Sequence, residues 1–234
     1  MNIIIKFITT LFNLYIVFYH NKKIIRSMNL EKNATVLDIG SHESELYKSL
    51  KVMKIEIVRY IAFEPVEKLY NNLLKQHKFN SNFEVINFAL SNEKTVKKIE
   101  VNSISSTNTF SKINKNKLKY KFKNILTQFS SNETRIEMVQ CEKLDNLDLN
   151  ITNNLNLIKI DTEGHELEVI QGGLAFFKKY KPRYLVIEFQ KKDNYLNYKP
   201  DRLRELIKEL GYEEIKSFRG PLNLFVDNLY ELKD

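Results

Sequence analysis

Proton-accepting side chains are concentrated in one short stretch in the second half of the sequence. A mostly apolar run is followed at once by Asp161, Glu163, His165 and Glu166. A carboxylate or an imidazole beside a substrate hydroxyl can take up its proton, and such a general base typically accelerates a reaction by about 10² to 10⁴-fold. Acidic residues also suit the first turn of a helix, because they interact favourably with its dipole. The stretch indicates either a reaction site, with Asp161, Glu163 and His165 as candidate catalytic residues, or a solvated helix start.

Polar residues also follow two earlier apolar runs. The first run contains Asp38, and Gly40 and Ser41 come directly after it. The glycine allows a tight turn and a close approach of the backbone to a ligand. The second run ends in Glu64, at about the distance from Gly40 at which an acid binds ribose hydroxyls in dinucleotide folds. The three glycines of a pyrophosphate-binding loop are not found here, so NAD is disfavoured, whereas an adenosine without pyrophosphate, as in S-adenosylmethionine, fits.

The elements that must position these residues alternate between strands and helices. Strands are predicted over residues 36–39, 59–63, 83–89, 155–160 and 184–189. Helices are predicted over residues 43–53, after Pro65, through the run that contains Leu167 and Phe177, and after Pro200. A C-terminal hairpin is predicted over residues 212–218 and 223–230. This alternation predicts a parallel sheet with crossover helices, and ligands bind where its strand order reverses. If strands 36–39 and 155–160 are neighbours, the residues that follow them face one crevice.

A long segment interrupts the alternation between the third and fourth strands. Residues 96–101 and 135–141 have the character of extra strands, and the residues between them are polar and rich in lysine. Loops of this length in a domain usually have a function. One interpretation is a lid that holds an anionic or sugar substrate, and the other is a solvated, lysine-rich excursion.

Composition narrows the class of protein. The chain has 234 residues, a formal net charge of +8 and one cysteine. This length suits a single domain with a sizeable core. One cysteine excludes an intramolecular disulfide framework and a zinc site of the CxxC type, so we expect a reducing cytoplasm, with association at a membrane left open. The basic charge would suit RNA, an anionic membrane surface or a phosphorylated substrate.

The N-terminal residues form an apolar segment with helical spacing. Its apolar positions are Ile4, Phe7, Ile8, Leu11, Leu14, Tyr15 and Phe18. The segment is slightly short for a hydrocarbon core of about 30 Å. Three interpretations stay open: a helix that packs on its own domain or on a second subunit, a peripheral membrane contact through residues 1–19, and a true membrane span.

Several of these segments resemble the FkbM family of methyltransferases. The motifs that occur in the family's order and spacing are VLDIG, AFEP, INFALS, the pair Ser105-Ser106, LDNL at 144–147, IKIDTEGHELEVIQGG and YLVIEF. The resemblance implies an α/β, Rossmann-like class I methyltransferase fold, a three-layer sandwich with a mostly parallel seven-stranded sheet in the order 3-2-1-4-5-7-6. We therefore expect an N-terminal apolar helix over residues 1–28. A methyltransferase domain over residues 29–234 would end in an antiparallel hairpin and carry the basic insertion at about 96–141.

The resemblance also assigns roles by position. It implies that Asp38, Gly40, Ser41 and Glu64 bind S-adenosylmethionine and that Ala89 lies near the adenine. Asp161 and Glu163 would form the acidic edge of the reaction site, where a hydroxyl of a sugar or glycan is methylated.

One position departs from the family. Its first motif usually reads GANxG, and here Ser44 replaces the second glycine. A serine at this position can still cap the following helix.

Two further residues are candidates for binding the substrate. Glu188 ends a predicted strand and would orient the acceptor, and Ser106 belongs to the serine pair of the insertion. A divalent ion bridging Asp161 and Glu188 fits the ligand type, but the spacing does not require a metal.

Two other functions stay open on the sequence. The charge, and the lysines interleaved with Phe110, Tyr120 and Phe122, would suit ribose 2'-O-methylation of RNA, although no RNA-binding module is recognisable and a nucleic-acid partner is not expected. The serine at position 44 would suit a membrane-attached scaffold whose chemistry has lapsed. The sequence does not fix the oligomeric state, and a homodimer remains open.

Overall fold

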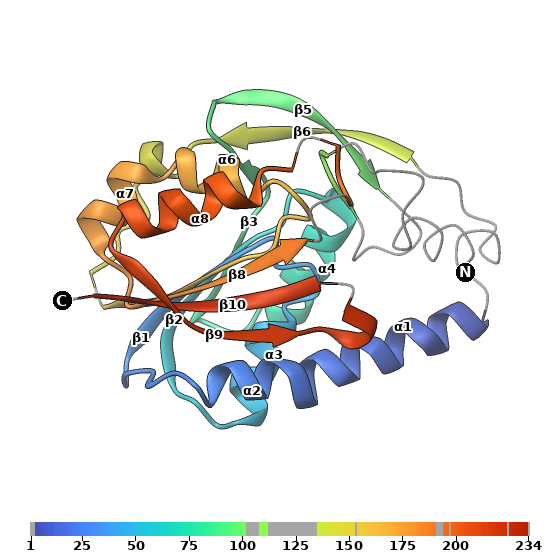
Figure 1. Ribbon diagram of the computed structural model, residues 1–234. Coiled ribbons are helices and arrows are strands. Elements are labelled where there is room, and N and C mark those ends of the chain that lie inside the picture. The colour runs from blue at the N-terminus through green and yellow to red at the C-terminus, as the bar shows by residue number, and fades with distance from the viewer. Residues whose placement is uncertain are drawn as a thin grey trace.

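The computed structural model describes residues 3–101, 108–111, 135–152, 154–190, 194–196, 198–223 and 225–233. A seven-stranded sheet runs through the molecule (Figure 1). From one edge to the other its strands are β3 (Phe83–Ile86), β2 (Ile57–Phe63), β1 (Ala34–Ile39), β7 (Leu155–Ile160), β8 (Tyr184–Gln190), β10 (Phe225–Leu232) and β9 (Tyr212–Arg219). All neighbours are parallel except the pairs that involve β10, which are antiparallel. The order and the antiparallel C-terminal hairpin confirm the expectation.

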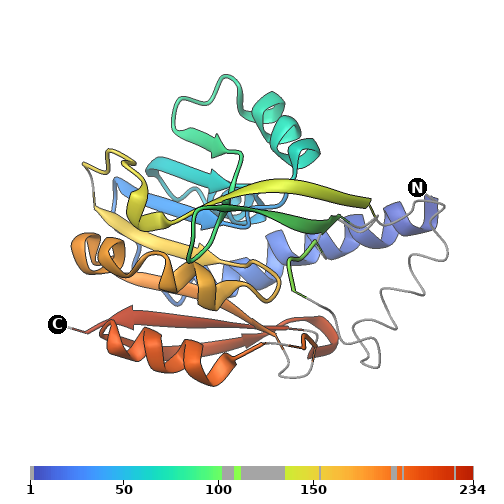
Figure 2. The same ribbon diagram turned by 90° about the horizontal axis from the view of Figure 1, so that it is seen from above.

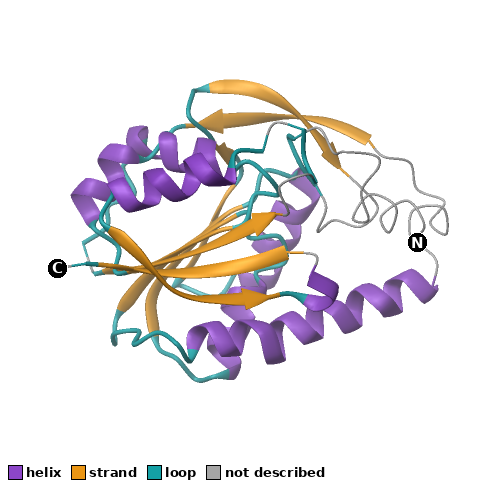
Figure 3. Cartoon of the chain, in the orientation of Figure 1, coloured by secondary structure: helices purple, strands orange, loops and turns teal. Residues whose placement is uncertain are grey.

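Helices cover both faces of this sheet and complete the three layers (Figure 3). Helices α2 (Asn21–Ile25) and α3 (Glu45–Val52) pack on one face. Helices α6 (Glu166–Gln171), α7 (Leu174–Tyr180) and α8 (Pro200–Glu209) pack on the other. Helix α4 (Glu67–His77) contacts β3, and short 3-10 turns occupy Leu144–Asn146 and Pro221–Asn223. The buried side chains of the central strands are mostly aliphatic and aromatic, and burial of that apolar surface stabilises the layers.

A second, smaller sheet consists of β4 (Ala89–Leu90), β6 (Arg135–Glu142) and β5 (Thr95–Val101). It lies on the same side of the large sheet as α6, α7 and α8 (Figures 1 and 2). The two extra strands expected in the insertion are therefore present. Much of the lysine-rich stretch between them, and with it Ser106, lies outside the described residues.

Two predicted elements are divided in the structure. The strand predicted over residues 83–89 splits into β3 and β4, which belong to different sheets, and Asn87 between them donates hydrogen bonds to the carbonyls of Glu64 and Pro65. The helix predicted through Leu167 and Phe177 splits into α6 and α7. A Cβ at Gly172 would lie 1.9 Å from the carbonyl oxygen of Ser91, so the chain can approach the small sheet there only because this residue is a glycine.

The N-terminal segment is helical, as expected. It comprises α1 (Ile3–Tyr15), a π-helical turn (Ile16–His20) and α2. The turn and α2 pack against α3 and are held by hydrogen bonds from His20 to Asp227 (2.7 Å) and from Asn21 to Ser49 (3.1 Å). Packing on the chain's own domain therefore applies to residues 16–25, whereas Phe7, Ile8, Leu11 and Leu14 on α1 are exposed. Among the described helices none combines the length and the apolar character that crossing a membrane requires.

Candidate functional site

The ends of β1 and β7 adjoin, as the sequence predicts. Asp38 pairs with Lys159 across the two strands, and the amide of Asp161 donates to the carbonyl of Ile39 at 2.9 Å. Gly40 has a φ of +79°, and a Cβ there would lie 1.9 Å from the carbonyl oxygen of Asp161. Because that neighbour is backbone and cannot move aside, only glycine fits this position. The loop after β1 and the acidic stretch after β7 therefore lie against each other.

The loop after β1 presents buried polar atoms that have no hydrogen-bond partner among the described residues. They are Asp38 Oδ1, Ser41 Oγ and Ser44 Oγ. Leaving such groups buried and unpaired costs free energy, so each calls for an explanation. Burial raises the pKa of Asp38 to about 6, although Lys159 and a hydrogen bond from Tyr60 act in the opposite direction. These atoms are available to a polar ligand that bears hydroxyl or ammonium groups.

Glu64 directly follows β2 and is buried. Its Oε2 accepts a hydrogen bond from the amide of His42, and its Oε1 accepts one from the amide of Val66, both at 2.9 Å. Burial raises the pKa of Glu64 to about 7. Each carboxylate oxygen has two lone pairs. Both oxygens therefore keep the capacity to accept a second hydrogen bond, for example from a ribose hydroxyl.

The sequence analysis missed a charged pair beside Glu64. His42 Nδ1 lies 2.9 Å from Glu45 Oε1. Burial alone would lower the pKa of His42, but the Glu45 carboxylate raises it to about 9. Burial would likewise raise the pKa of Glu45, and His42 lowers it to about 2. His42 is therefore a cation next to Glu64 near neutral pH, which favours the ionised carboxylate.

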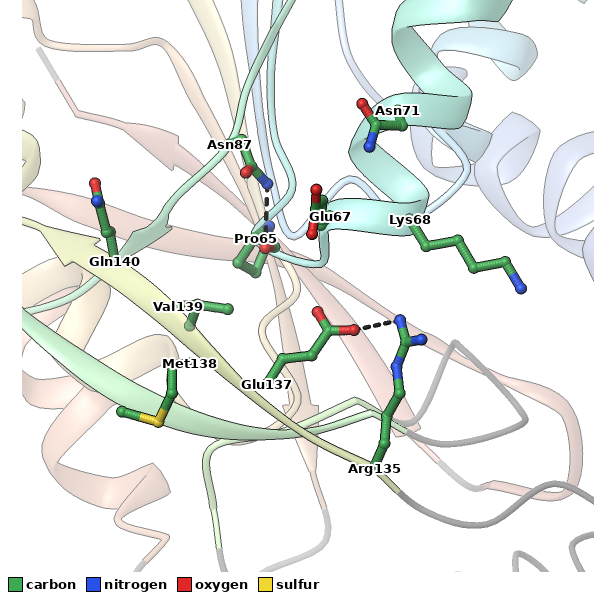
Figure 4. Close-up of a pocket in the computed structure, with 10 residues that line it drawn as sticks. All are labelled: Pro65, Glu67, Lys68, Asn71, Asn87, Arg135, Glu137, Met138, Val139 and Gln140. Atoms are coloured by element: carbon green, nitrogen blue, oxygen red, sulfur yellow. Dashed lines mark hydrogen bonds and ion pairs between the residues drawn. The ribbon is translucent and has the colours of Figure 1, made fainter.

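A hollow of about 750 Å³ opens beyond Glu64, between the start of α4 and β6 (Figure 4). Pro65 and Asn87 lie on one side of it, and Val139 and Gln140 lie on the other. Ala89, the residue expected near the adenine, is not among the lining residues. Its side chain is buried between the small sheet and the start of α4. Asn87, which joins β3 to β4 and donates to the carbonyl of Glu64, does line the hollow.

Lys159 is the second functional candidate that sequence reasoning missed. Its ammonium donates to Asp161 Oδ2 at 2.7 Å. Burial disfavours the charged ammonium, but Asp161, Asp38 and Asp227 together raise the pKa of Lys159 above its usual range. Burial also raises the pKa of Asp161, and Lys159 partly offsets that rise. The available signal was a single lysine in an otherwise uncharged buried strand, and its meaning depends on Asp161 and on two acids from other strands.

Glu163 and Glu188 are brought together through Gln190. The Glu163 carboxylate accepts hydrogen bonds from Tyr195 at 2.5 Å and from Gln190 at 3.3 Å. The same Gln190 amide donates to Glu188. The carbonyl of Glu163 also accepts a bond from Thr109 at 2.6 Å. Glu163 is therefore already engaged by donors, and Tyr195 is a residue of the site that no local pattern indicated.

His165 contacts the region of the small sheet, whereas Glu166 holds the loop that follows β7. His165 Nε2 lies 3.0 Å from Ser91 Oγ, and its ring is 5.1 Å from that of Phe110. Burial lowers the pKa of His165 to about 3. Glu166 Oε1 accepts bonds from the amides of Thr162 (3.1 Å) and Gly164 (3.0 Å) and so shapes the loop. The contacts of His165 are with Ser91 and Phe110 and not with Asp161 or Glu163. Glu166 does stand in the first turn of α6, but it is fully buried and not solvated.

Within the described residues, no group of three or more histidine, cysteine, aspartate or glutamate side chains is arranged to hold a metal ion.

Ser44 stands at the start of α3 with a φ of +56°, and no side-chain cap bond is formed there. The expected capping role is thus not seen. A left-handed backbone conformation costs a non-glycine residue about 1–2 kcal/mol of folding free energy. Replacement by glycine removes this cost, but glycine loses more backbone entropy on folding, which cancels about half of the gain. We expect Ser44→Gly to stabilise the protein by about 1 kcal/mol and to raise Tm in a thermal melt followed by circular dichroism.

Ser49→Gly is the matched control, because Ser49 is equally buried but lies within α3 and donates to the carbonyl of Glu45 at 2.7 Å. It should lower Tm. A melt in which both substitutions lower Tm would show that the left-handed serine carries no strain.

The strand order, the glycine after β1 and the acid after β2 define the class of protein: a Rossmann-like class I methyltransferase fold. The sequence matches the model of the methyltransferase FkbM domain over residues 38–214. The chain therefore belongs to the FkbM methyltransferase family, as the motifs indicated. A comparison with curated protein sequences found no match.

Solved structures share this fold at low sequence identity. The methyltransferase FkbM of Methylobacillus flagellatus KT is 14% identical with a TM-score of 0.56, and the match covers 88% of this chain but 45% of that one. A SAM-dependent methyltransferase from Aquifex aeolicus is 13% identical with a TM-score of 0.50, covering 93% and 92% of the two chains. Aeropyrum pernix fibrillarin, solved with natively bound S-adenosyl-L-methionine, is 9% identical with a TM-score of 0.50, covering 94% and 76%. The chain thus spans less than half the length of the M. flagellatus protein.

Proposed function

We propose that this protein transfers the methyl group of S-adenosylmethionine to a hydroxyl of a sugar or glycan. The observation that carries the proposal is the contact between the ends of β1 and β7, where a Cβ on Gly40 would lie 1.9 Å from the carbonyl oxygen of Asp161. A ligand held by the loop after β1 would then meet the proton-accepting carboxylates after β7. Methyl transfer needs these two functions side by side.

The residues after β1 and β2 fit S-adenosylmethionine. Glu64 has acceptor capacity for ribose hydroxyls, and the hollow that begins at Pro65 has room for a base beyond them. Asp38 Oδ1 and Ser41 Oγ are buried acceptors for the amino-acid end of the cofactor. When bound, this cofactor supplies an electrophilic methyl group on a sulfonium. Related folds solved with the cofactor or described as dependent on it support the assignment.

Asp161 is the best-placed proton acceptor. Its carboxylate is partly shielded and lies beside the loop of Gly40. The ammonium of Lys159 donates to its Oδ2 at 2.7 Å. The substrate hydroxyl would be the nucleophile for the methyl group that the bound cofactor supplies, and its proton needs an acceptor. The hydroxyl proton passes to Asp161. His165 is a poor alternative, because a pKa of about 3 makes its imidazole a weak base.

The acceptor class rests on the family resemblance, so the test varies the acceptor. Purified protein is incubated with methyl-labelled S-adenosylmethionine and, in parallel, cell-surface glycan fractions and total RNA from the source organism. We expect label in the glycan fraction, retained under mild alkali because a methyl ether resists hydrolysis. Label in RNA ribose would show that the acceptor is RNA, and it would leave the proposed methyl transfer to a hydroxyl intact. If calorimetry shows that the cofactor binds but neither fraction is labelled, the proposed acceptor class is wrong. If the cofactor does not bind, the whole proposal is wrong.

A further inference from the structure

Helix α1 carries an apolar stripe that the described part of the domain leaves uncovered. The stripe consists of Phe7, Leu11 and Leu14 on α1 and of Phe18 on the π-helical turn that continues it. These residues recur at intervals of four and three and so lie along one side of the helical segment. Phe7 is 63% exposed, Leu11 50% and Phe18 51%. Side chains of this size are normally buried, and an exposed row of them marks an interaction surface.

The opposite side of the same segment is fixed to the domain. Asn13 donates to Glu43 at 3.2 Å, and further along His20 bonds Asp227 and Ile24 is buried against the sheet. The helix is thus anchored by the side that faces away from the stripe. Because these bonds set its rotation, the stripe cannot turn inward without breaking a buried hydrogen bond and a packed core contact.

Basic residues continue the stripe. Lys22 lies one turn beyond Phe18, with its ammonium 5.6 Å from the Phe18 ring centre, and the ammonium of Lys23 lies 4.0 Å from the ring centre of Tyr19. Arg26 is exposed just after them. Aromatic side chains with adjacent cations suit the boundary between acyl chains and anionic headgroups.

We infer that α1 docks this protein on an anionic phospholipid bilayer, lying in the interface with the stripe inserted and the three cations on lipid phosphates. The charge favours this occupant over a second copy of the chain. Two stripes packed in parallel would bring the two sets of Lys22, Lys23 and Arg26 close to each other, and in either orientation two copies that each carry a formal charge of +8 repel one another. An anionic membrane surface attracts each of these cations instead.

Docking in this manner would orient the domain. Helix α1 projects beyond the carboxyl ends of β7 and β8 (Figure 1). Asp161 follows β7 at this end of the sheet, so the candidate site would open close to the bilayer surface. The inference does not depend on the proposed chemistry, because it rests on α1 and its flanking cations alone.

The test is co-sedimentation of the purified chain with vesicles of phosphatidylglycerol and, separately, of phosphatidylcholine. We expect binding to phosphatidylglycerol that weakens with added salt, and much weaker binding to phosphatidylcholine. Combining Leu11→Glu with Phe18→Glu should lower the partition coefficient by about tenfold or more. Combining Lys22→Glu with Lys23→Glu should lower it for phosphatidylglycerol and remove most of the salt dependence.

The matched control combines Phe79→Glu with Ile136→Glu. Both residues are exposed and apolar; Phe79 lies in the loop after α4, and Ile136 lies on β6. It adds the same charge and should bind as the wild type does. The substituted side chains are exposed except that of Lys22, which is half-buried, and circular dichroism checks that the fold is retained. The inference is overturned if the wild type stays in the supernatant, if the control loses binding equally, or if light scattering shows a dimer that the Leu11→Glu, Phe18→Glu variant dissociates.

Discussion

Replacing Asp161 by asparagine is expected to slow methyl transfer by about 10² to 10⁴-fold while leaving the affinity for S-adenosylmethionine within a few-fold of wild type. The amide keeps the shape of the side chain and an oxygen for Lys159, whose ammonium lies 2.7 Å from Oδ2. It cannot take up the hydroxyl proton at neutral pH. Single-turnover rates with a saturating labelled cofactor measure the chemical step, and calorimetry measures binding.

Glu163→Gln is the matched variant, and its rate of methyl transfer is compared with that of Asp161→Asn. The Glu163 carboxylate already accepts hydrogen bonds from Tyr195 and Gln190, so its loss should reduce the rate far less. His165→Gln should also retain most activity, since His165 faces Ser91. If Asp161→Asn keeps the wild-type rate and Glu163→Gln loses it, the proton acceptor is Glu163. A wild-type profile that declines at acid pH would accompany either outcome, because the acceptor must be ionised.

Glu64→Gln is expected to weaken binding of S-adenosylmethionine by about 10 to 100-fold, because it removes hydrogen bonds to a charged acceptor. The wild-type affinity should also depend on pH. Burial raises the pKa of Glu64 to about 7, and only the carboxylate accepts from both ribose hydroxyls. Affinity should therefore rise with pH by up to about tenfold per unit below pH 7 and level off above it. Calorimetry across this range is the measurement.

The shape of the pH profile separates a binding role from a fold defect. In Glu64→Gln the rise near pH 7 should vanish, leaving only a weaker dependence near pH 6 from Asp38. Glu56→Gln, an exposed glutamate before β2, is the control and should keep the wild-type profile. A variant profile parallel to the wild-type one would mean that Glu64 does not titrate with binding.

The same pKa shift has the opposite consequence for the stability of the free protein. The folded state holds the Glu64 proton more tightly than the unfolded chain, whose value is about 4.5. Stability from this group is therefore present at acid pH and lost as pH rises from about 4.5 to 7. Glu166, also raised to about 7 by burial, adds to this loss. A bound cofactor should offset the Glu64 part of the loss, and thermal melts with and without it would show that.

Local sequence patterns were sufficient for the elements and for the order of the motifs. Strand 155–160 has the predicted bounds, and the hairpin, the crossover helices and the strands of the insertion all form. Periodicity and the residues that end an element act over a few positions, so they can be recognised without knowledge of the fold. The FkbM motifs then supplied the strand order that local patterns cannot give.

The division of elements depended on contacts between distant segments. The predicted helix through Leu167 and Phe177 breaks at Gly172 because the carbonyl of Ser91 lies against it. The third strand breaks at Asn87 because its amide bonds carbonyls beyond β2. Neither partner is close in sequence, so periodicity alone favoured continuous elements.

By itself the sequence determined the sheet, the family and which acids end the strands: Asp38, Glu64 and Asp161. Only the tertiary structure decided what each acid faces. Lys159 becomes a shared cation because Asp38 on β1 and Asp227 on β10 lie near it together with its sequence neighbour Asp161, and His165 becomes a weak base because the small sheet buries it. Burial and charge pairing arise between residues far apart in the chain, whereas residue type and spacing are local properties.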